Sequence, residues 1–212
     1  MKKIFLSSYF AGTIKQFQTF IQENSITAKR VLCIPTAGNV EDYTGYIDEG
    51  FQSLIDLGYQ IDNLDVANDD TDSVVFKIQQ AEILFITGGN TFYLLQELKR
   101  KNLLPLLVEK IQSGTPYIGE SAGAIILAPS IEYNKIMDSP KSAPELLDYS
   151  GLGITNFYTL PHYIEAPFTK TVQETYNNYH KRLNLLPINN HKAICSYTKK
   201  MDYFYSVRKM KV

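Results

Sequence analysis

Short apolar segments alternate with segments of helical periodicity through the first two-thirds of the chain. The apolar segments predict strands at residues 4 to 7, 31 to 35, 61 to 66, 83 to 86 and 116 to 118. Between them, apolar side chains recur at helical spacing in residues 13 to 23, 42 to 57, 71 to 80, 91 to 101 and 104 to 112. Repeated strand–helix units of this kind predict an α/β fold, a three-layer doubly wound sheet that is mostly parallel.

The last third of the chain lacks this alternation. Residues 129 to 153 are rich in proline and glycine and predict a long irregular excursion, a feature often found beside active sites. A strand at 157 to 160, a tyrosine-rich helix at 169 to 184 and a C-terminal hairpin of residues 193 to 197 and 203 to 207 are expected to follow. Because no linker or repeat interrupts the sequence, we expect residues 1–212 to form a single domain.

Charge and cysteine content exclude several classes of protein. The net charge of −1 gives no basic surplus for binding nucleic acid, and no apolar segment has the length needed to span a membrane. Cys33 and Cys195 lie far apart within apolar runs, which indicates core thiols in a reducing compartment. The spacing of metal ligands is absent from the sequence. We therefore expect a cytoplasmic protein with no metal, cofactor, nucleic-acid or membrane partner.

Residues 119 to 123 read Gly-Glu-Ser-Ala-Gly and directly follow the last strand of the parallel series. A G-x-S-x-G sequence at a strand-to-helix turn presents the serine hydroxyl above the sheet edge, where it can act as a nucleophile. The next backbone N–H, that of Ala122, would lie at a helix N-terminus and could receive a developing negative charge. The alternative is that Ser121 only caps the following helix.

The chain has three histidines, and a serine nucleophile needs one as its base. His162 follows a predicted strand and should therefore lie at the same sheet edge as Ser121. His191 lies in a polar loop and is the second candidate. His180 lies within a polar helix, where a solvated side chain is expected.

Residues 88 to 91, Gly-Gly-Asn-Thr, follow another predicted strand. They have a structural interpretation, in which glycine allows a tight turn and Asn90 or Thr91 caps the next helix. In a functional interpretation, the N–H of Gly89 joins that of Ala122 in an oxyanion hole. The spacing does not match a phosphate-binding loop, which disfavours a nucleotide site.

Three segments occur in an order that resembles the serine peptidases of family S51, the peptidase E (aspartyl dipeptidase) and cyanophycinase relatives. They are Thr-Gly-Gly-Asn-Thr-Phe-Tyr-Leu-Leu at 87 to 95, Tyr-Ile-Gly-Glu-Ser-Ala-Gly-Ala at 117 to 124 and Leu-Pro-His-Tyr at 160 to 163. The resemblance covers roughly residues 1 to 205 and implies a sheet similar to that of class I glutamine amidotransferases. It implies Ser121 as nucleophile, His162 as base, and the amides of Gly89 and Ala122 as the oxyanion hole. It also implies short peptides, or acidic side-chain-linked compounds, as substrates, with Asn90 of the first segment beside them.

One departure from that family concerns the residue that orients the histidine. The family usually has an acid shortly before the C-terminal hairpin, and Asn190 occupies the matching position here. An asparagine can hold an imidazole tautomer, but it cannot stabilise imidazolium by charge. A slow enzyme or a Ser-His dyad is therefore expected, with Asp138 and Glu165 as alternative orienting residues.

A second departure concerns specificity. On the helix after the histidine, Tyr176 takes the place of the arginine with which aspartyl dipeptidases bind the substrate's aspartate. Tyrosine lacks the charged fork that recognises a carboxylate. Glu120, next to the nucleophile, would disfavour acidic substrates and attract a free amino terminus, unless it is a solvated turn residue. We therefore expect that this protein is not a strict Asp-X dipeptidase.

Together these features predict a serine peptidase that hydrolyses short peptides. Two alternatives stay open: a binding or regulatory homologue with weak or absent catalysis, and an esterase for small molecules that uses the same residues. The sequence does not decide between a monomer and a homodimer.

Overall fold

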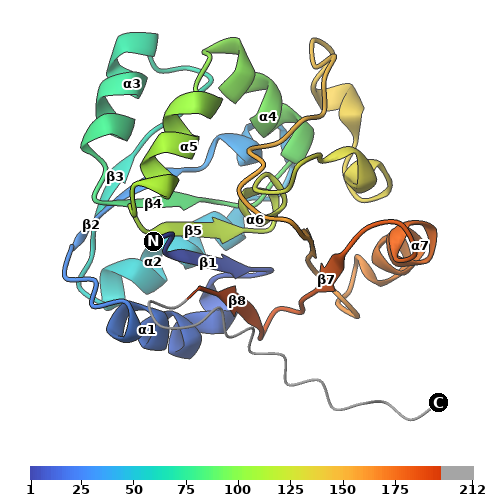
Figure 1. Cartoon of the computed structure of the whole chain (residues 1–212), viewed down its shortest axis with the longest axis horizontal. Helices are drawn as coiled ribbons and strands as arrows, with labels where there is room; N and C mark the ends of the chain where they lie inside the picture. Colours follow the sequence, from blue (N-terminus) through green and yellow to red (C-terminus); the bar gives the residue numbers. More distant parts are fainter. Residues whose placement is uncertain (197–212) are drawn as a thin grey trace.

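The computed structural model describes residues 1–196. Its main sheet has six strands in the order β3-β2-β4-β5-β1-β8 (Figure 1). The first five strands in this order run parallel, and β8 pairs antiparallel with β1. This confirms the predicted, mostly parallel sheet. The strands are β1 Ile4–Ser7, β2 Arg30–Ile34, β3 Gln60–Asn63, β4 Ile83–Ile86, β5 Tyr117–Glu120 and β8 Ala193–Cys195.

Helices cover both faces of the main sheet (Figure 1). Side chains alternate between the faces along each strand, and β1 shows this clearly. Phe5 packs against Phe17 and Phe20 of α1, whereas Leu6 belongs to the opposite core, which α3, α4 and α5 cover. The three layers are therefore as predicted. The helices are α1 Ile14–Glu23 and α2 Gly45–Asp56 on one face and α3 Thr71–Gln80, α4 Thr91–Arg100 and α5 Leu104–Gln112 on the other.

Local capping decides where the helices begin. Asp70 has extended backbone angles, and its side chain accepts a hydrogen bond from the N–H of Ser73, so α3 begins one residue after it. Asn90 caps α4 in the same way by accepting from the N–H groups of Phe92 and Tyr93.

A second, two-stranded sheet lies beside the main one. Its strands β6 (Tyr158–Leu160) and β7 (Leu185–Pro187) run parallel, and α7 (Thr169–Tyr179) connects them (Figure 1). We predicted β6 and α7, although with α7 ending at residue 184, and we did not predict β7. This sheet matters for the site because His162 follows β6 and Asn190 follows β7.

The segment from 129 to 153 is irregular as expected, apart from two 3-10 helices, η3 Glu132–Ile136 and η4 Pro140–Ser142. At the C-terminus, β8 coincides with the first arm of the predicted hairpin and pairs with β1. The second arm, residues 203 to 207, lies outside the described residues, so the hairpin itself stays a prediction. Among residues 1–196, no helix combines the length and the apolar character needed to cross a membrane.

Candidate active site

Ser121 lies at the sharp turn between β5 and the short helix α6 (Ala122–Ile125). Its backbone angles, φ 46° and ψ −103°, are strained for a residue with a side chain. The turn is closely packed, since a Cβ on Gly119 would lie 2.5 Å from the carbonyl oxygen of Gly123. A Cβ on Gly123 would lie 2.1 Å from the carbonyl oxygen of Ile86. The two glycines of the G-x-S-x-G sequence are therefore needed to build this turn.

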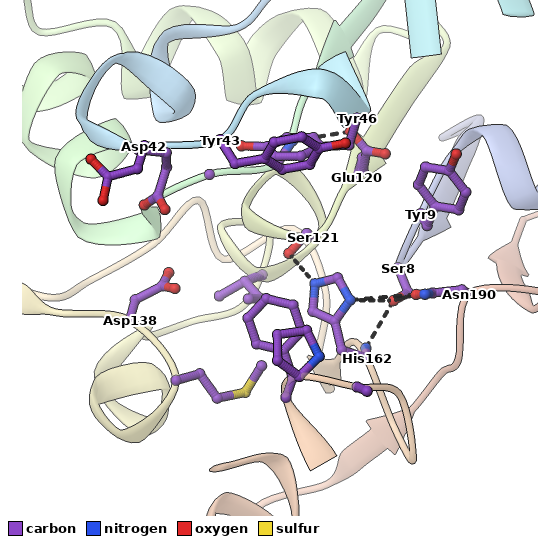
Figure 2. A pocket seen from close by; sticks show the side chains of 18 residues that line it. Ser8, Tyr9, Asp42, Tyr43, Tyr46, Glu120, Ser121, Asp138, His162 and Asn190 are labelled. Carbon is purple, nitrogen blue, oxygen red and sulfur yellow. Dashed lines mark hydrogen bonds between the residues drawn. The ribbon is translucent and has the colours of Figure 1, made fainter. Parts of the chain in front are cut away.

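The hydroxyl of Ser121 meets the imidazole of His162. The distance from Ser121 Oγ to His162 Nε2 is 2.9 Å, a good hydrogen bond (Figure 2). The ring of His162 stacks on Phe168 with 4.4 Å between ring centroids, which helps to hold its orientation. Neither His180 nor His191 lines the pocket that opens beside Ser121, and both are exposed. Of the three histidines, the structure thus brings only His162 to Ser121.

Ser8 and Asn190 hold the other edge of the imidazole (Figure 2). Ser8 Oγ lies 3.0 Å from His162 Nδ1 and donates to Asn190 Oδ1 over 2.7 Å. The backbone N–H of His162 also donates to Ser8 Oγ, over 2.8 Å, and Asn190 Oδ1 lies 3.4 Å from Nδ1. Sequence reasoning missed Ser8. Its only signal was its position as the first residue after β1, at the carboxyl end of a parallel strand, where such sheets bind ligands.

The two alternative orienting residues do not contact the imidazole. Asp138 Oδ2 accepts hydrogen bonds from the N–H of Thr91 and from Asn134 Nδ2, although Asp138 lines the pocket. Glu165 Oε1 accepts from the backbone N–H of Asn190 over 3.3 Å. The structure therefore gives the orienting contacts to Ser8 and Asn190.

Burial lowers the pKa of His162 to about 4. The hydrogen bond with Asn190 and the charge of Glu165 raise the pKa in opposition, without cancelling the effect of burial. His162 is therefore neutral at pH 7, and Nε2 is able to accept a proton from Ser121 when Nδ1 carries the ring proton.

Two backbone N–H groups near Ser121, those of Gly89 and Ala122, were predicted to form an oxyanion hole. Gly89 has φ +124°, and a Cβ there would lie 2.3 Å from the carbonyl carbon of Ala37, so only glycine fits. Within residues 1–196, neither the N–H of Gly89 nor that of Ala122 donates to a protein acceptor. The neighbouring N–H of Gly88 is already bound by Glu120. Gly89 lines the pocket beside Ser121, whereas Ala122 is fully buried, so the oxyanion hole formed by the two stays a prediction.

Glu120 is not the solvated turn residue that we considered. Its side chain is 1% exposed and accepts hydrogen bonds from the N–H groups of Phe10, at 2.8 Å, and Gly88, at 3.2 Å. Burial raises its pKa to about 7, although both N–H donors act to lower it. Glu120 thus joins the ends of β4 and β5 to the loop after β1, and it also lines the pocket.

Two predicted substrate-binding residues do not line the pocket. Asn90 is buried as the cap of α4, and its Nδ2 donates to the carbonyl oxygen of Ser139. Tyr176 stacks on His180, at 4.9 Å between ring centroids, and contacts Tyr163. Capping and helix-surface packing occupy these side chains, so a contact of either residue with substrate stays a prediction that this pocket does not support.

A pocket of about 460 Å³ opens beside Ser121 and His162. Its lining includes four acidic side chains, Glu41, Asp42, Glu120 and Asp138, and no lysine or arginine of residues 1–196. Four aromatic side chains also line it: Tyr9, Tyr43 and Tyr46, which Figure 2 labels, and Phe168. Among the described residues, the buried hydroxyl of Tyr46 has no hydrogen-bond partner. The pocket is therefore acidic and aromatic, and of a size typical of small-ligand sites.

Comparisons with known proteins identify the family of this chain. The model of Peptidase family S51 matches residues 4–203. "Uncharacterized peptidase Lin0382" of Listeria innocua is 43% identical over 194 residues, 92% of each chain. "Peptidase E" of Shewanella sp. (strain W3-18-1) is 36% identical over 144 residues, 68% of this chain and 58% of that protein.

A solved structure shares the whole fold. The crystal structure of a candidate peptidase E protein from Listeria monocytogenes EGD-e has a TM-score of 0.87 and 40% sequence identity, and the match covers 94% of this chain and 96% of that one. Since the family model spans nearly the whole chain, the protein is a peptidase similar to peptidase E, and it belongs to peptidase family S51.

Proposed function

We propose that this peptidase is of the serine type and hydrolyses short peptides, with Ser121 as nucleophile and His162 as base. The observation that carries the proposal is the 2.9 Å contact of Ser121 Oγ with His162 Nε2 at a strained strand-to-helix turn. A serine hydroxyl is a weak nucleophile until an adjacent base accepts its proton. The neutral imidazole of His162 is such a base, and it faces the pocket.

The reaction has two halves. The proton of Ser121 passes to Nε2 of His162 as Oγ bonds to the carbonyl carbon, and the N–H groups of Gly89 and Ala122 stabilise the oxyanion. Nε2 then returns the proton to the departing amine as the C–N bond breaks, which leaves an acyl-enzyme. Water attacks the acyl carbon while giving a proton to Nε2, and that proton returns to Ser121 as the acid departs.

The pocket supports a specificity other than strict cleavage of Asp-X peptides. Recognition of a substrate carboxylate calls for a cationic partner, most often arginine. The pocket offers four acidic side chains and no such partner among the described residues. We expect neutral peptides, and peptides that carry a positive charge, to be the better substrates.

One observation favours a second candidate, a catalytically weak homologue that binds a ligand. His162 Nδ1 hydrogen-bonds only to the neutral side chains of Ser8 and Asn190 among residues 1–196. An imidazolium that forms in catalysis gains no ion pair there, which lowers the rate. An esterase would tolerate this better, because an ester has a better leaving group than an amide.

The test is cleavage of a dipeptide library by the wild-type protein, by Ser121→Ala and by Ser113→Ala, whose exposed serine at the end of α5 serves as control. We expect cleavage by the wild-type and control proteins, none by Ser121→Ala, and fluorophosphonate labelling that depends on Ser121. Labelling without cleavage of any amide, together with turnover of matched esters, would indicate the esterase. Absence of labelling and cleavage would indicate a binding protein.

The cytoplasmic location, like the choice between monomer and homodimer, stays a prediction.

A further inference from the structure

The hydroxyl of Ser8 has three hydrogen-bond partners in the site. It receives the backbone N–H of His162 at 2.8 Å, it donates to Asn190 Oδ1 at 2.7 Å, and it lies 3.0 Å from His162 Nδ1. A serine hydroxyl has one proton to donate and two lone pairs that accept. Because its proton goes to Asn190 and one lone pair accepts the N–H of His162, the remaining lone pair must accept the proton of Nδ1.

This count of donors and acceptors fixes the tautomer of the ring. When Nδ1 carries the proton, Nε2 has a free lone pair, which is the form that accepts the proton of Ser121. Asn190 Oδ1, at 3.4 Å from Nδ1, is a weaker partner of the ring than Ser8 at 3.0 Å. Asn190 acts mainly on Ser8, by taking its proton and so turning a lone pair toward the ring.

The backbone makes Ser8 a rigid support. β1 and β5 are paired neighbours, with Ser7 in register with Glu120, and the N–H of Ser121 donates to the carbonyl oxygen of Ser7 over 2.9 Å. Ser8 and Ser121 are thus the next residues of two adjacent, hydrogen-bonded strands. The main sheet therefore fixes the position of Ser8, which contacts the ring, relative to Ser121, which the ring activates.

We propose that Ser8 is a positioning residue that holds His162 as the Nδ1–H tautomer, with Asn190 orienting the Ser8 hydroxyl. The inference rests on the proposed serine mechanism, in which His162 must accept a proton at Nε2. Two uncharged side chains, Ser8 and Asn190, thus take the position in which a carboxylate would otherwise contact the ring.

Ser7 provides a matched control. It is the neighbouring residue in the sequence, it is fully buried, and its Oγ has no hydrogen-bond partner among the described residues. Ser7→Ala therefore removes one buried hydroxyl without touching the site, whereas Ser8→Ala removes the partner of Nδ1. Ser8→Thr keeps a hydroxyl at the same position and tests whether the hydroxyl itself is what matters.

The first experiment reads the tautomer directly in the resting protein. The ring nitrogens are observed by NMR after labelling histidine with ¹⁵N, and the His162 signals are identified by their loss in His162→Gln. We expect wild type and Ser7→Ala to show Nδ1–H, Ser8→Ala to lose this preference, and Ser8→Thr to keep it. A wild-type ring protonated at Nε2 would overturn the proposal, even if Ser8→Ala failed to fold.

The second experiment is kinetic. With a peptide that the wild-type protein cleaves, we expect kcat of Ser8→Ala to fall by about tenfold to a hundredfold with KM unchanged, since orientation of a general base is lost while binding is retained. Ser7→Ala should keep wild-type kcat, and Ser8→Thr should recover most of it. An unchanged kcat in Ser8→Ala beside an inactive Ser121→Ala would contradict the role of Ser8. If the wild-type protein cleaves nothing, the proposed function fails, and the tautomer measurement still decides the role of Ser8.

Discussion

At the scale of single residues, we expect the burial of His162 to set the pH range of activity. In the proposed mechanism the neutral imidazole is the active form, and burial lowers its pKa to about 4. The base therefore stays neutral as pH falls from 7 to about 5, and it is lost only as pH falls through about 4. We expect the rate of inactivation by a fluorophosphonate, which involves no ionising substrate, to follow this acid limb.

A control separates His162 from its buried neighbour Glu120, whose pKa is raised to about 7. If the acid limb belongs to His162, Glu120→Gln should leave its midpoint near 4. A wild-type midpoint near the ordinary histidine value of about 6.5 would contradict the burial argument.

Replacing Asn190 by aspartate would place a negative charge beside Ser8 and His162. In Asn190→Asp, a carboxylate still accepts the proton of Ser8 and now faces the imidazolium that forms in catalysis. We expect kcat to rise by about tenfold, and the acid limb to move to higher pH, because an adjacent negative charge raises a histidine pKa by one unit or more. Steady-state kinetics with one peptide across pH measures both effects.

Asn189→Asp is the control for this change. It adds the same charge one residue away, where the side chain accepts the N–H of His191 and does not contact His162. Equal effects of the two variants would show that general electrostatics, and not the contact with Ser8, is responsible. A slower Asn190→Asp would contradict the argument that charge limits the rate.

The residues of the site differ in how far the sequence reveals them. Ser121 and His162 stand in motifs with a mechanical reason, so both could be proposed before the structure was seen. Ser8 belongs to no motif, because a serine after a strand is ordinary, and its importance arises from contacts with residues more than 150 positions away. Asn90 is the converse case, since it lies in a motif although its side chain caps a helix.

At the scale of elements, the turn after β4 supplies half of the proposed oxyanion hole. In Gly89→Ala, the added Cβ would meet the backbone of Ala37 at 2.3 Å, and φ of +124° disfavours any side chain. We expect the free energy of unfolding to fall by about 2 kcal/mol or more. We also expect the rate of fluorophosphonate labelling to fall by about a hundredfold as the donor moves. Urea unfolding and labelling kinetics measure the two effects.

Gly58→Ala separates conformation from crowding. Gly58 also has positive φ, at +78°, but a Cβ there would meet nothing within 4 Å. Its substitution should cost about 1 kcal/mol of the free energy of unfolding and leave labelling unchanged. If both variants lose the same stability and label at the wild-type rate, the close approach of Gly89 to Ala37 has no functional meaning.

The strand–helix units could be predicted because their signals are local. Strands such as β4 are continuous apolar runs, and helices such as α4 show helical spacing between recognisable ends. β7 was missed because Leu185–Pro187 is a run of three residues that ends in proline, and only its pairing with β6 makes it a strand. Pairing between distant segments leaves no periodic signal in either of them.

At the scale of the whole molecule, the site is assembled from the carboxyl ends of five strands. Ser8 follows β1, Gly88 and Gly89 follow β4, Ser121 follows β5, and His162 and Asn190 follow β6 and β7. Parallel strands place such ends at one edge of a sheet. The sequence therefore predicted that the site lies at the carboxyl edge of the main sheet. Only the structure shows where the small sheet lies and how it brings His162 to Ser121.

The charge of the pocket predicts selectivity among peptides. Burial raises the pKa of Glu41, and the negative charges of Asp138 and Asp42 raise it further, because neighbouring carboxylates repel one another. A substrate carboxylate entering this field is repelled, whereas a substrate cation is attracted. We expect kcat/KM for a dipeptide with an aspartate to lie about tenfold below that of its asparagine counterpart. A dipeptide with a lysine in the same position should have a higher kcat/KM than the asparagine peptide. The difference should shrink as salt screens the charges.

Variants of the pocket lining test whether these carboxylates are responsible. Glu41→Gln and Asp42→Asn each remove a charge that lines the pocket, so each should raise kcat/KM for the aspartate peptide and leave the asparagine peptide unchanged. Asp48→Asn removes the same charge from the first turn of α2, outside the lining, and should change neither. A wild-type enzyme that prefers the aspartate peptide would require a cationic group near the substrate. None of the described lining residues supplies one, so that result would place the acidic side chain of the substrate outside this pocket.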